Sequence, residues 1–176
     1  DHGGPMLGVQ HLIDIGRTRI AHITGPETFE AVALRYRGYR DALAAARLAE
    51  IDGHYRHGPW SEAWGREAVA ALFDGRTDVP DALFCGNDQI ARGASDALRE
   101  RGVSVPGEVA VLGFDNWEVM TLAARPPLSS IDMNLRELGH LAGERLIAMI
   151  GGERFKGVEH LPCTLVLRQS SDPSQS

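Results

Sequence analysis

The chain has 176 residues, of which 43% are hydrophobic and 24% are charged, and its formal net charge is −6. This composition suits one folded domain with a hydrophobic core and excludes a disordered or fibrous chain. No apolar run approaches the ~20 residues that a membrane helix needs, and no basic-then-apolar signal segment opens the chain, so we expect a soluble protein with no membrane partner.

The charge distribution limits the expected binding partners, and the cysteine content indicates the cellular compartment. The arginines are spread along the chain without a cluster of four or more, so strong binding of DNA by this segment is not expected. Cys85 and Cys163 each lie in or next to an apolar run and are too few for a disulfide framework. The sequence therefore predicts two free thiols in a reducing, cytoplasmic compartment.

The first half of the chain alternates helix and strand signals. Apolar residues at helical spacing precede Gly16, a strand-like run ends at Gly25-Pro26, and Ser61 is a good N-cap. These signals predict, in order, a helix at 5–15, a strand at 19–24, a helix at 30–48, a brief strand at 51–57 and a helix at 61–73.

The second half is centred on a strand, a tight turn and a helix. Ala82 to Cys85 is a buried strand, Gly86 permits the turn, and Asn87 or Asp88 can accept hydrogen bonds from the first N–H groups of a helix. We expect that helix to end at 101 and to be followed by a strand at 109–114. Residues 125–127, with two prolines, then form a connection between elements, and 129–132 is extended. A helix at 135–150, a last strand at 164–167 and a frayed polar tail at 170–176 complete the chain. Strands separated by helices of this length require right-handed crossovers. The expected fold class is α/β, with a mainly parallel sheet and helices on both faces.

Sequence signatures of common enzymes are missing from the chain. It has no Gly-x-Ser-x-Gly elbow, no Gly-x-x-x-x-Gly-Lys loop, no Gly-x-Gly-x-x-Gly loop and no His-Glu-x-x-His pair. His54 and His57 lie close to Glu50 and Asp52, but no second ligand pair completes a metal site. We therefore predict solvated loop histidines, no catalytic residues, no metal and no cofactor.

Four polar and aromatic residues suit a small polyhydroxylated ligand: Arg35, Trp60, Asn87 and Asp115. A guanidinium bridges two hydroxyls, an amide donates and accepts, a carboxylate accepts, and an indole ring lies against the apolar face of a sugar. Each residue also has an ordinary alternative role. Arg35 could be a surface residue of its helix, Asn87 and Asp115 could cap helices, and Trp60 could form a hydrophobic staple beside the Ser61 cap. Because all four lie at strand or helix ends of one sheet, their joint reading as a binding site is favoured.

Motifs along almost the whole chain, in order, resemble those of the LacI/GalR family of bacterial transcriptional regulators. The matching stretches are Leu7-Gly8-Val9-Gln10-His11-Leu12 with Gly16 and Ile20, Arg35-Tyr36-Arg37-Gly38-Tyr39, Pro80-Asp81-Ala82, Asn87-Asp88, Ala91-Arg92-Gly93, Gly113-Phe114-Asp115, Pro126-Pro127-Leu128-Ser129-Ser130-Ile131, Leu138-Gly139, and Leu161-Pro162 through Leu165-Val166-Leu167-Arg168. The resemblance is to the effector-binding core, which has the type I periplasmic-binding-protein fold. It implies that Arg35, Trp60, Asn87 and Asp115 contact a sugar-like effector.

The resemblance also implies a division of the chain between two subdomains. Residues 1–132 plus 164–169 would form the C-terminal effector-binding subdomain, 133–163 would return to the N-terminal subdomain, and 170–176 would be a tail. The rest of the N-terminal subdomain and the helix-turn-helix that reads operator DNA would lie outside this chain. The helix at 135–150 would then lack its partner, and this chain alone would bind effector weakly or not at all.

In such a regulator the effector changes the pose of the two subdomains and thereby the spacing of paired DNA-binding heads. We expect a homodimer, with the helix at 87–101 and the segment 119–124 as candidate contacts, although both could be ordinary core. Two alternatives remain, a periplasmic sugar-binding protein of a transport system and an enzyme on a flavodoxin-like sheet. The stretches Pro-Pro-Leu-Ser-Ser and Leu-Val-Leu-Arg-Gln-Ser-Ser favour the regulator over the transport protein.

Overall fold

A six-stranded sheet organises the computed structural model, which describes residues 2–172 and 174. The strands are β1 (Ile20–Thr24), β2 (Tyr55–His57), β3 (Ala82–Cys85), β4 (Ala110–Phe114), β5 (Ser129–Asp132) and β6 (Thr164–Val166). Their order is β2-β1-β3-β4-β5-β6, and every neighbouring pair is parallel except β5 and β6, which are antiparallel. The predicted α/β class with a mainly parallel sheet is confirmed.

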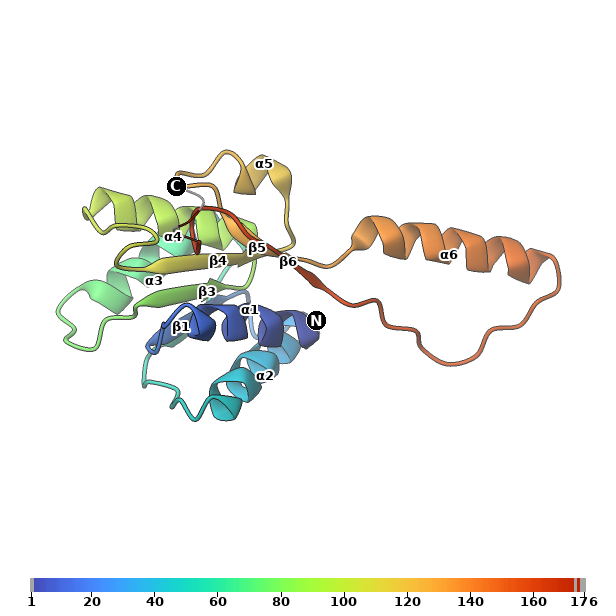
Figure 1. The fold of residues 1–176 in the computed structure, drawn as a ribbon, viewed down its shortest axis with the longest axis horizontal. Helices are drawn as coiled ribbons and strands as arrows, with labels where there is room; N and C mark the ends of the chain where they lie inside the picture. The colour runs from blue at the N-terminus through green and yellow to red at the C-terminus, as the bar shows by residue number, and fades with distance from the viewer. Residues whose placement is uncertain (1, 173, 175–176) are drawn as a thin grey trace.

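Helices cover both faces of this sheet (Figure 1). The helices are α1 (Gly3–Asp14), α2 (Glu30–Ala45), α3 (Glu62–Phe73), α4 (Asp88–Glu100), α5 (Glu118–Thr121) and α6 (Leu135–Ile150). One core cluster joins α1 and α2 to the sheet, and a second joins α3 and α4 to the opposite face. Strands β1, β3 and β4 are buried along their whole length, as expected of central strands covered on both sides.

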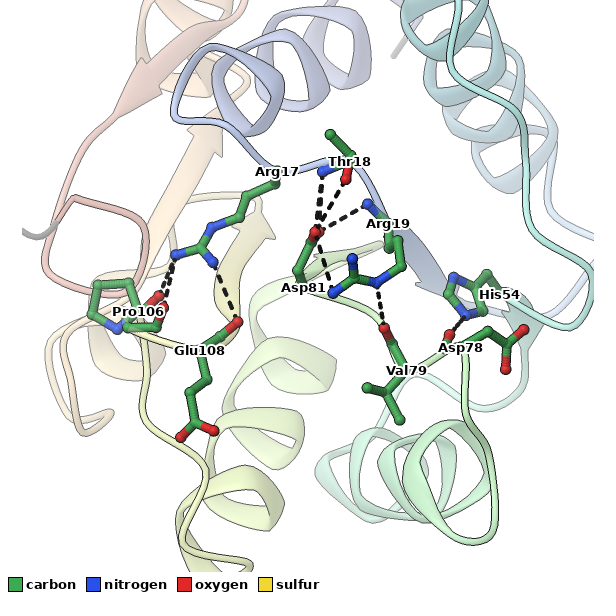
Figure 2. Close-up of polar contacts among 10 residues, drawn as sticks. Arg17, Thr18, Arg19, His54, Asp78, Val79, Asp81, Pro106 and Glu108 are labelled. Carbon is green, nitrogen blue, oxygen red and sulfur yellow. Dashed lines mark hydrogen bonds and ion pairs between the residues drawn. The ribbon is translucent and has the colours of Figure 1, made fainter.

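Polar side chains connect the loops at the end of the sheet where β1, β3 and β4 begin (Figure 2). The Asp81 carboxylate accepts hydrogen bonds from the backbone N–H groups of Thr18, at 3.2 Å, and Arg19, at 2.9 Å. The Arg17 guanidinium donates to the carbonyl oxygens of Pro106 and Glu108. These contacts join the loops that precede three strands. The opposite end of the sheet, where the parallel strands finish, is left for a binding site.

Helix α6 projects away from the sheet and its flanking helices (Figure 1). It occupies the predicted residues, yet none of its side chains is buried. Its exposed apolar residues are Leu135, Leu138, Leu146, Ile147, Met149 and Ile150. The assignment of 133–163 to another subdomain stays a prediction, and this exposed apolar surface agrees with it.

Two predictions about exposure were wrong. His54 is completely buried and its Nε2 lies 2.7 Å from the Asp78 carbonyl oxygen, whereas His57 is exposed as expected. In the tail, Ser170 and Ser171 are buried: the Ser170 hydroxyl accepts from the Ser129 N–H and donates to the Val111 carbonyl. Of the remaining tail, residues 173, 175 and 176 lie outside the described residues.

The proposed dimer segments differ in what they expose. The apolar residues of α4 belong to the core against α3 and the sheet, so a dimer contact through α4 stays a prediction that rests on its polar side chains. Around the short α5, which the sequence did not predict, Val119 and Leu122 are exposed.

Within the described residues, Cys85 and Cys163 are free thiols. None of the helices described there is long and apolar enough to cross a membrane.

Candidate functional site

The four residues singled out in the sequence lie together at the C-terminal ends of the parallel strands. Arg35 comes from α2, Trp60 precedes α3, Asn87 is the N-cap of α4, and Asp115 follows β4. Together with Ala31 they line a pocket of about 260 Å³. The predicted convergence is therefore observed, and the role of these residues toward a ligand remains a proposal.

Arg35 is fixed in the wall of this pocket and is not a surface residue, with only 6% of it exposed. Its guanidinium donates to the Gly86 carbonyl, lies 3.6 Å from an Asp115 carboxylate oxygen, and stacks 3.9 Å above the centroid of the Phe114 ring. Burial lowers the pKa of Arg35, and the Asp115 charge opposes that shift. The side chain thus presents a held, planar set of donors.

Asp115 and the next residue have unusual backbone geometry. Their φ angles are +100° at Asp115 and +52° at Asn116, in the region that favours glycine. Asn116 is held there by hydrogen bonds of its backbone N–H to Ser130 Oγ, of its Nδ2 to Asp132, and of its Oδ1 from Arg168. Such strain, of about 1–3 kcal/mol per residue, persists where surrounding contacts impose it and clusters at functional sites.

The carboxylate of Asp115 faces Arg35 and caps no helix, so the capping alternative is wrong for this residue. Burial raises the pKa of Asp115, and the nearby Arg35 charge opposes that rise. The side chain remains one-third exposed. Asp115 can therefore accept hydrogen bonds from ligand hydroxyls while the arginine limits its protonation.

Asn87 both caps a helix and lines the pocket. Its Oδ1 accepts from the Ile90 N–H at 2.9 Å, so the capping alternative is correct for this side-chain oxygen. Within the part of the chain that the structure describes, the Asn87 amide nitrogen has no hydrogen-bond acceptor. This nitrogen remains available as a donor to a ligand.

Trp60 forms a hydrophobic wall of the same pocket. Its ring lies so close to Gly25 that a Cβ at Gly25 would come within 2.1 Å of it. The ring meets Phe29 edge-on at a centroid distance of 6.1 Å, and the Arg35 guanidinium lies 5.8 Å from its centroid. The position where a staple partner would be needed is Gly65, which has no side chain, so the staple alternative finds no support.

Asp88 follows Asn87 at the predicted strand end, and its hydrogen-bond partners were not predicted from the sequence. Asp88 is buried, and its carboxylate accepts from Ser130 Oγ and from the Trp117 backbone N–H, both at 2.6 Å. Burial raises the pKa of Asp88 to about 7, against the lowering effect of these two hydrogen bonds. Asp88 therefore ties α4 to β5 and to the loop after Asp115.

The site has the composition of a binding site for a polar molecule. It offers a guanidinium, an amide, a carboxylate and an aromatic ring around one small pocket. Among the described residues, no group of three or more His, Cys, Asp or Glu side chains could hold a metal ion. Donors, acceptors and a stacking surface together suit a ligand that carries several hydroxyls.

Comparison with known proteins places the chain in a family. The model of the periplasmic binding protein-like domain matches residues 9–171. The lactose operon repressor of Escherichia coli K12 is 34% identical over 169 residues, covering 96% of this chain and 46% of the repressor. The ribose operon repressor of the same strain is 40% identical over 147 residues, covering 84% of this chain and 44% of the repressor.

Solved structures agree with these sequence matches. The crystal structure of the lac repressor dimer bound to operator and the anti-inducer ONPF has a TM-score of 0.87 at 32% identity, covering 97% of this chain and 50% of that one. The chain thus spans about half the length of the curated relatives that it matches. These relatives are transcriptional regulators and not enzymes. The chain belongs to the periplasmic binding protein-like domain family, in the form that LacI/GalR transcriptional regulators contain.

Proposed function

We propose that this chain is the effector-sensing part of a LacI-type transcriptional regulator, and that it binds a sugar or a similar small polar effector at Arg35, Trp60, Asn87 and Asp115. The observation that carries the proposal is the convergence of these four side chains on one pocket where the strands end. The names of the relatives, repressors of a lactose and of a ribose operon, support a sugar as the effector.

The geometry suggests how each side chain would act on such a ligand. The Arg35 guanidinium would donate to two adjacent hydroxyls, and Asp115, 3.6 Å from it, would accept from another. The Asn87 amide would donate beside them, and the Trp60 ring would pack on the C–H face of the sugar. No nucleophile beside a base is part of this arrangement, so we propose a binding protein and not an enzyme.

The whole regulator would work as a two-state switch. An N-terminal subdomain would supply the other wall of the cleft, and effector binding would favour the pose in which both walls contact it. A homodimer would transmit this change to helix-turn-helix heads on operator DNA, and the dimer named in the lac repressor structure supports this arrangement. The exposed Leu122 is a candidate dimer contact. The compartment would be the cytoplasm, whereas a transport protein of the same fold would act in the periplasm.

Calorimetric titration of the full-length regulator with a sugar panel tests the site. For the sugar that binds, Arg35→Ala should weaken affinity by about 10- to 100-fold, because hydrogen bonds from a charged donor are lost. Asp115→Asn should weaken it less, since an acceptor remains. Arg37→Ala is the matched control, because Arg37 lies on the same helix with an exposed side chain.

Unchanged sugar affinity in both Arg35→Ala and Asp115→Asn would contradict the site assignment. Titration of the 176-residue chain alone gives a second test of the same proposal. We expect weak or undetectable binding by this chain, because one wall of the cleft would be missing. Binding as tight as that of the full-length regulator would show that the site is complete without a second subdomain.

A further inference from the structure

A second and larger pocket adjoins the first at Asp115. It has a volume of about 590 Å³, and its lining includes Asp115, Trp117, Glu118, Met133 and Leu135. Met133 joins it to the first pocket as well, since the Arg35 guanidinium lies 3.8 Å from the Met133 sulfur. A ligand seated against Arg35 and Asp115 therefore lies next to the second pocket.

Trp117 is the largest side chain of this second pocket, and half of it is exposed. Its backbone is nonetheless fixed, because its N–H donates to the buried Asp88 carboxylate at 2.6 Å. The preceding residue, Asn116, is held by three hydrogen bonds, one each with Ser130, Asp132 and Arg168. The indole thus stands on a rigid support beside the pocket, at a place where no core contact explains it.

The chemistry around Trp117 suits a sugar ring. The lining of the second pocket combines the acidic residues Asp115 and Glu118, the aromatic Trp117, and the apolar Met133 and Leu135. A pyranose ring has an apolar C–H face that packs on an indole and hydroxyls at its rim that donate to carboxylates. A second sugar ring fits this combination better than a fully apolar group, because carboxylates beside an apolar group would lose solvation without gaining a partner.

The sizes of the two pockets point the same way. The second pocket, at about 590 Å³, adjoins the first, at about 260 Å³, and the two together offer room for more than one sugar ring. We propose that the effector contains at least two linked sugar rings, one held at Arg35 and Asp115 and the other packed on Trp117. This inference rests on the proposed function and specifies its ligand.

Matched pairs of sugars test the inference by calorimetry on the full-length regulator. The pairs are glucose against cellobiose and maltose, and galactose against lactose. At least one disaccharide should bind about tenfold more tightly than its monosaccharide, the size of effect that one aromatic packing contact supplies. Trp117→Ala should abolish this difference and leave the monosaccharide affinity unchanged. Trp117→Phe, which keeps an aromatic face, should retain most of it.

Trp64→Phe is the control, because the Trp64 indole donates to the Thr24 carbonyl at 3.0 Å and lines neither pocket. Equal affinity for monosaccharides and disaccharides, or an equal loss of both in Trp117→Ala, would overturn the two-ring inference and leave the proposed function standing. Failure of every sugar in this panel to bind would overturn the two-ring inference, whereas the proposed function is decided by the wider sugar panel and the Arg35→Ala variant. A Trp117→Ala protein that loses its dimer in sedimentation but keeps its preference for disaccharides would assign Trp117 to a second copy of the chain and overturn the inference.

Discussion

The backbone at Asp115 and Asn116 shows how single residues set the shape of the pocket. Both have positive φ angles, and the contacts of Asn116 to Ser130, Asp132 and Arg168 hold them in that conformation. The same turn aims the Asp115 carboxylate at Arg35 and places Trp117 at the rim of the second pocket. The strained turn therefore contributes to both pockets.

Replacing Asn116 separates the two causes of this geometry. Asn116→Ala should destabilise the fold by about 2–4 kcal/mol, since it removes two side-chain hydrogen bonds and puts alanine at positive φ. Asn116→Gly loses the same bonds but adopts φ +52° without strain, so it should be about 1 kcal/mol more stable than the alanine variant. Urea denaturation measures both. Equal stabilities would mean that the backbone angle contributes nothing.

Residues that end a strand or begin a helix could be predicted from the sequence, because glycine, proline and capping residues are local signals. Asn87, Asp88 and Asp115 were placed at strand ends in this way, and Arg35 was chosen for its guanidinium near the start of a helix. The partners of Asp88 and the role of Trp117 were not predicted, since the direction of the Asp88 carboxylate depends on Ser130, which is 42 residues away in sequence. A Trp directly after an Asp-Asn pair at a strand end is a usable signal that the prediction did not weigh.

Among the elements, amphipathic pattern decided what could be predicted. Helix α6 occupies the predicted residues 135–150 because its apolar spacing is local, although its apolar face finds no cover among the described residues. The four-residue α5 was missed because it is too short for a periodic pattern. Burial of Ser170 and His54 was missed for another reason: their partners Ser129, Val111 and Asp78 belong to other segments.

At the end of the sheet where the strands begin, opposite the pocket, Asp81 is expected to stabilise the fold (Figure 2). Asp81→Ala should lower the free energy of unfolding by about 2–3 kcal/mol, because the N–H groups of Thr18 and Arg19 lose a charged acceptor. Sugar affinity of the folded protein should not change, since Asp81 lies before β3 and the pocket lies after it. Asp52→Ala, at an exposed aspartate, is the control. A loss of affinity with unchanged stability would contradict this division between the two ends of the sheet.

Across the molecule, two buried titratable groups oppose one another in their effect on stability. His22 is fully buried in β1, where its Nδ1 lies 3.0 Å from the Phe84 carbonyl oxygen, and burial lowers its pKa to about 4. Burial raises the pKa of Asp88 to about 7. The nearby Arg35 charge adds to the shift at His22, and at Asp88 the Asp115 charge raises the pKa while Arg168 lowers it.

The direction in which each group changes the free energy of unfolding with pH depends on whether the folded or the unfolded state binds its proton more tightly. Unfolded His22 binds a proton near pH 6.5 and folded His22 only near pH 4, so its contribution is full above pH 6.5 and is lost as the pH falls to 4, by about 3 kcal/mol. Folded Asp88 keeps its proton up to about pH 7, whereas the unfolded carboxyl releases it near 3.8. Its contribution is therefore full below pH 4 and is lost as the pH rises to 7, by about 4 kcal/mol.

Between pH 4 and pH 7 these two contributions nearly cancel in the unaltered protein, and substitution of either residue should expose the other. Relative to the unaltered protein, His22→Phe should lose stability as the pH rises through this window, because the Asp88 contribution is no longer offset. Asp88→Asn should lose stability as the pH falls, because the His22 contribution is no longer offset. Urea denaturation at constant ionic strength measures both slopes, and the double variant should lack both. If Asp88→Asn follows the pH profile of the unaltered protein, the Asp88 carboxyl is already charged in the fold, and its hydrogen bonds from Ser130 and Trp117 outweigh its burial.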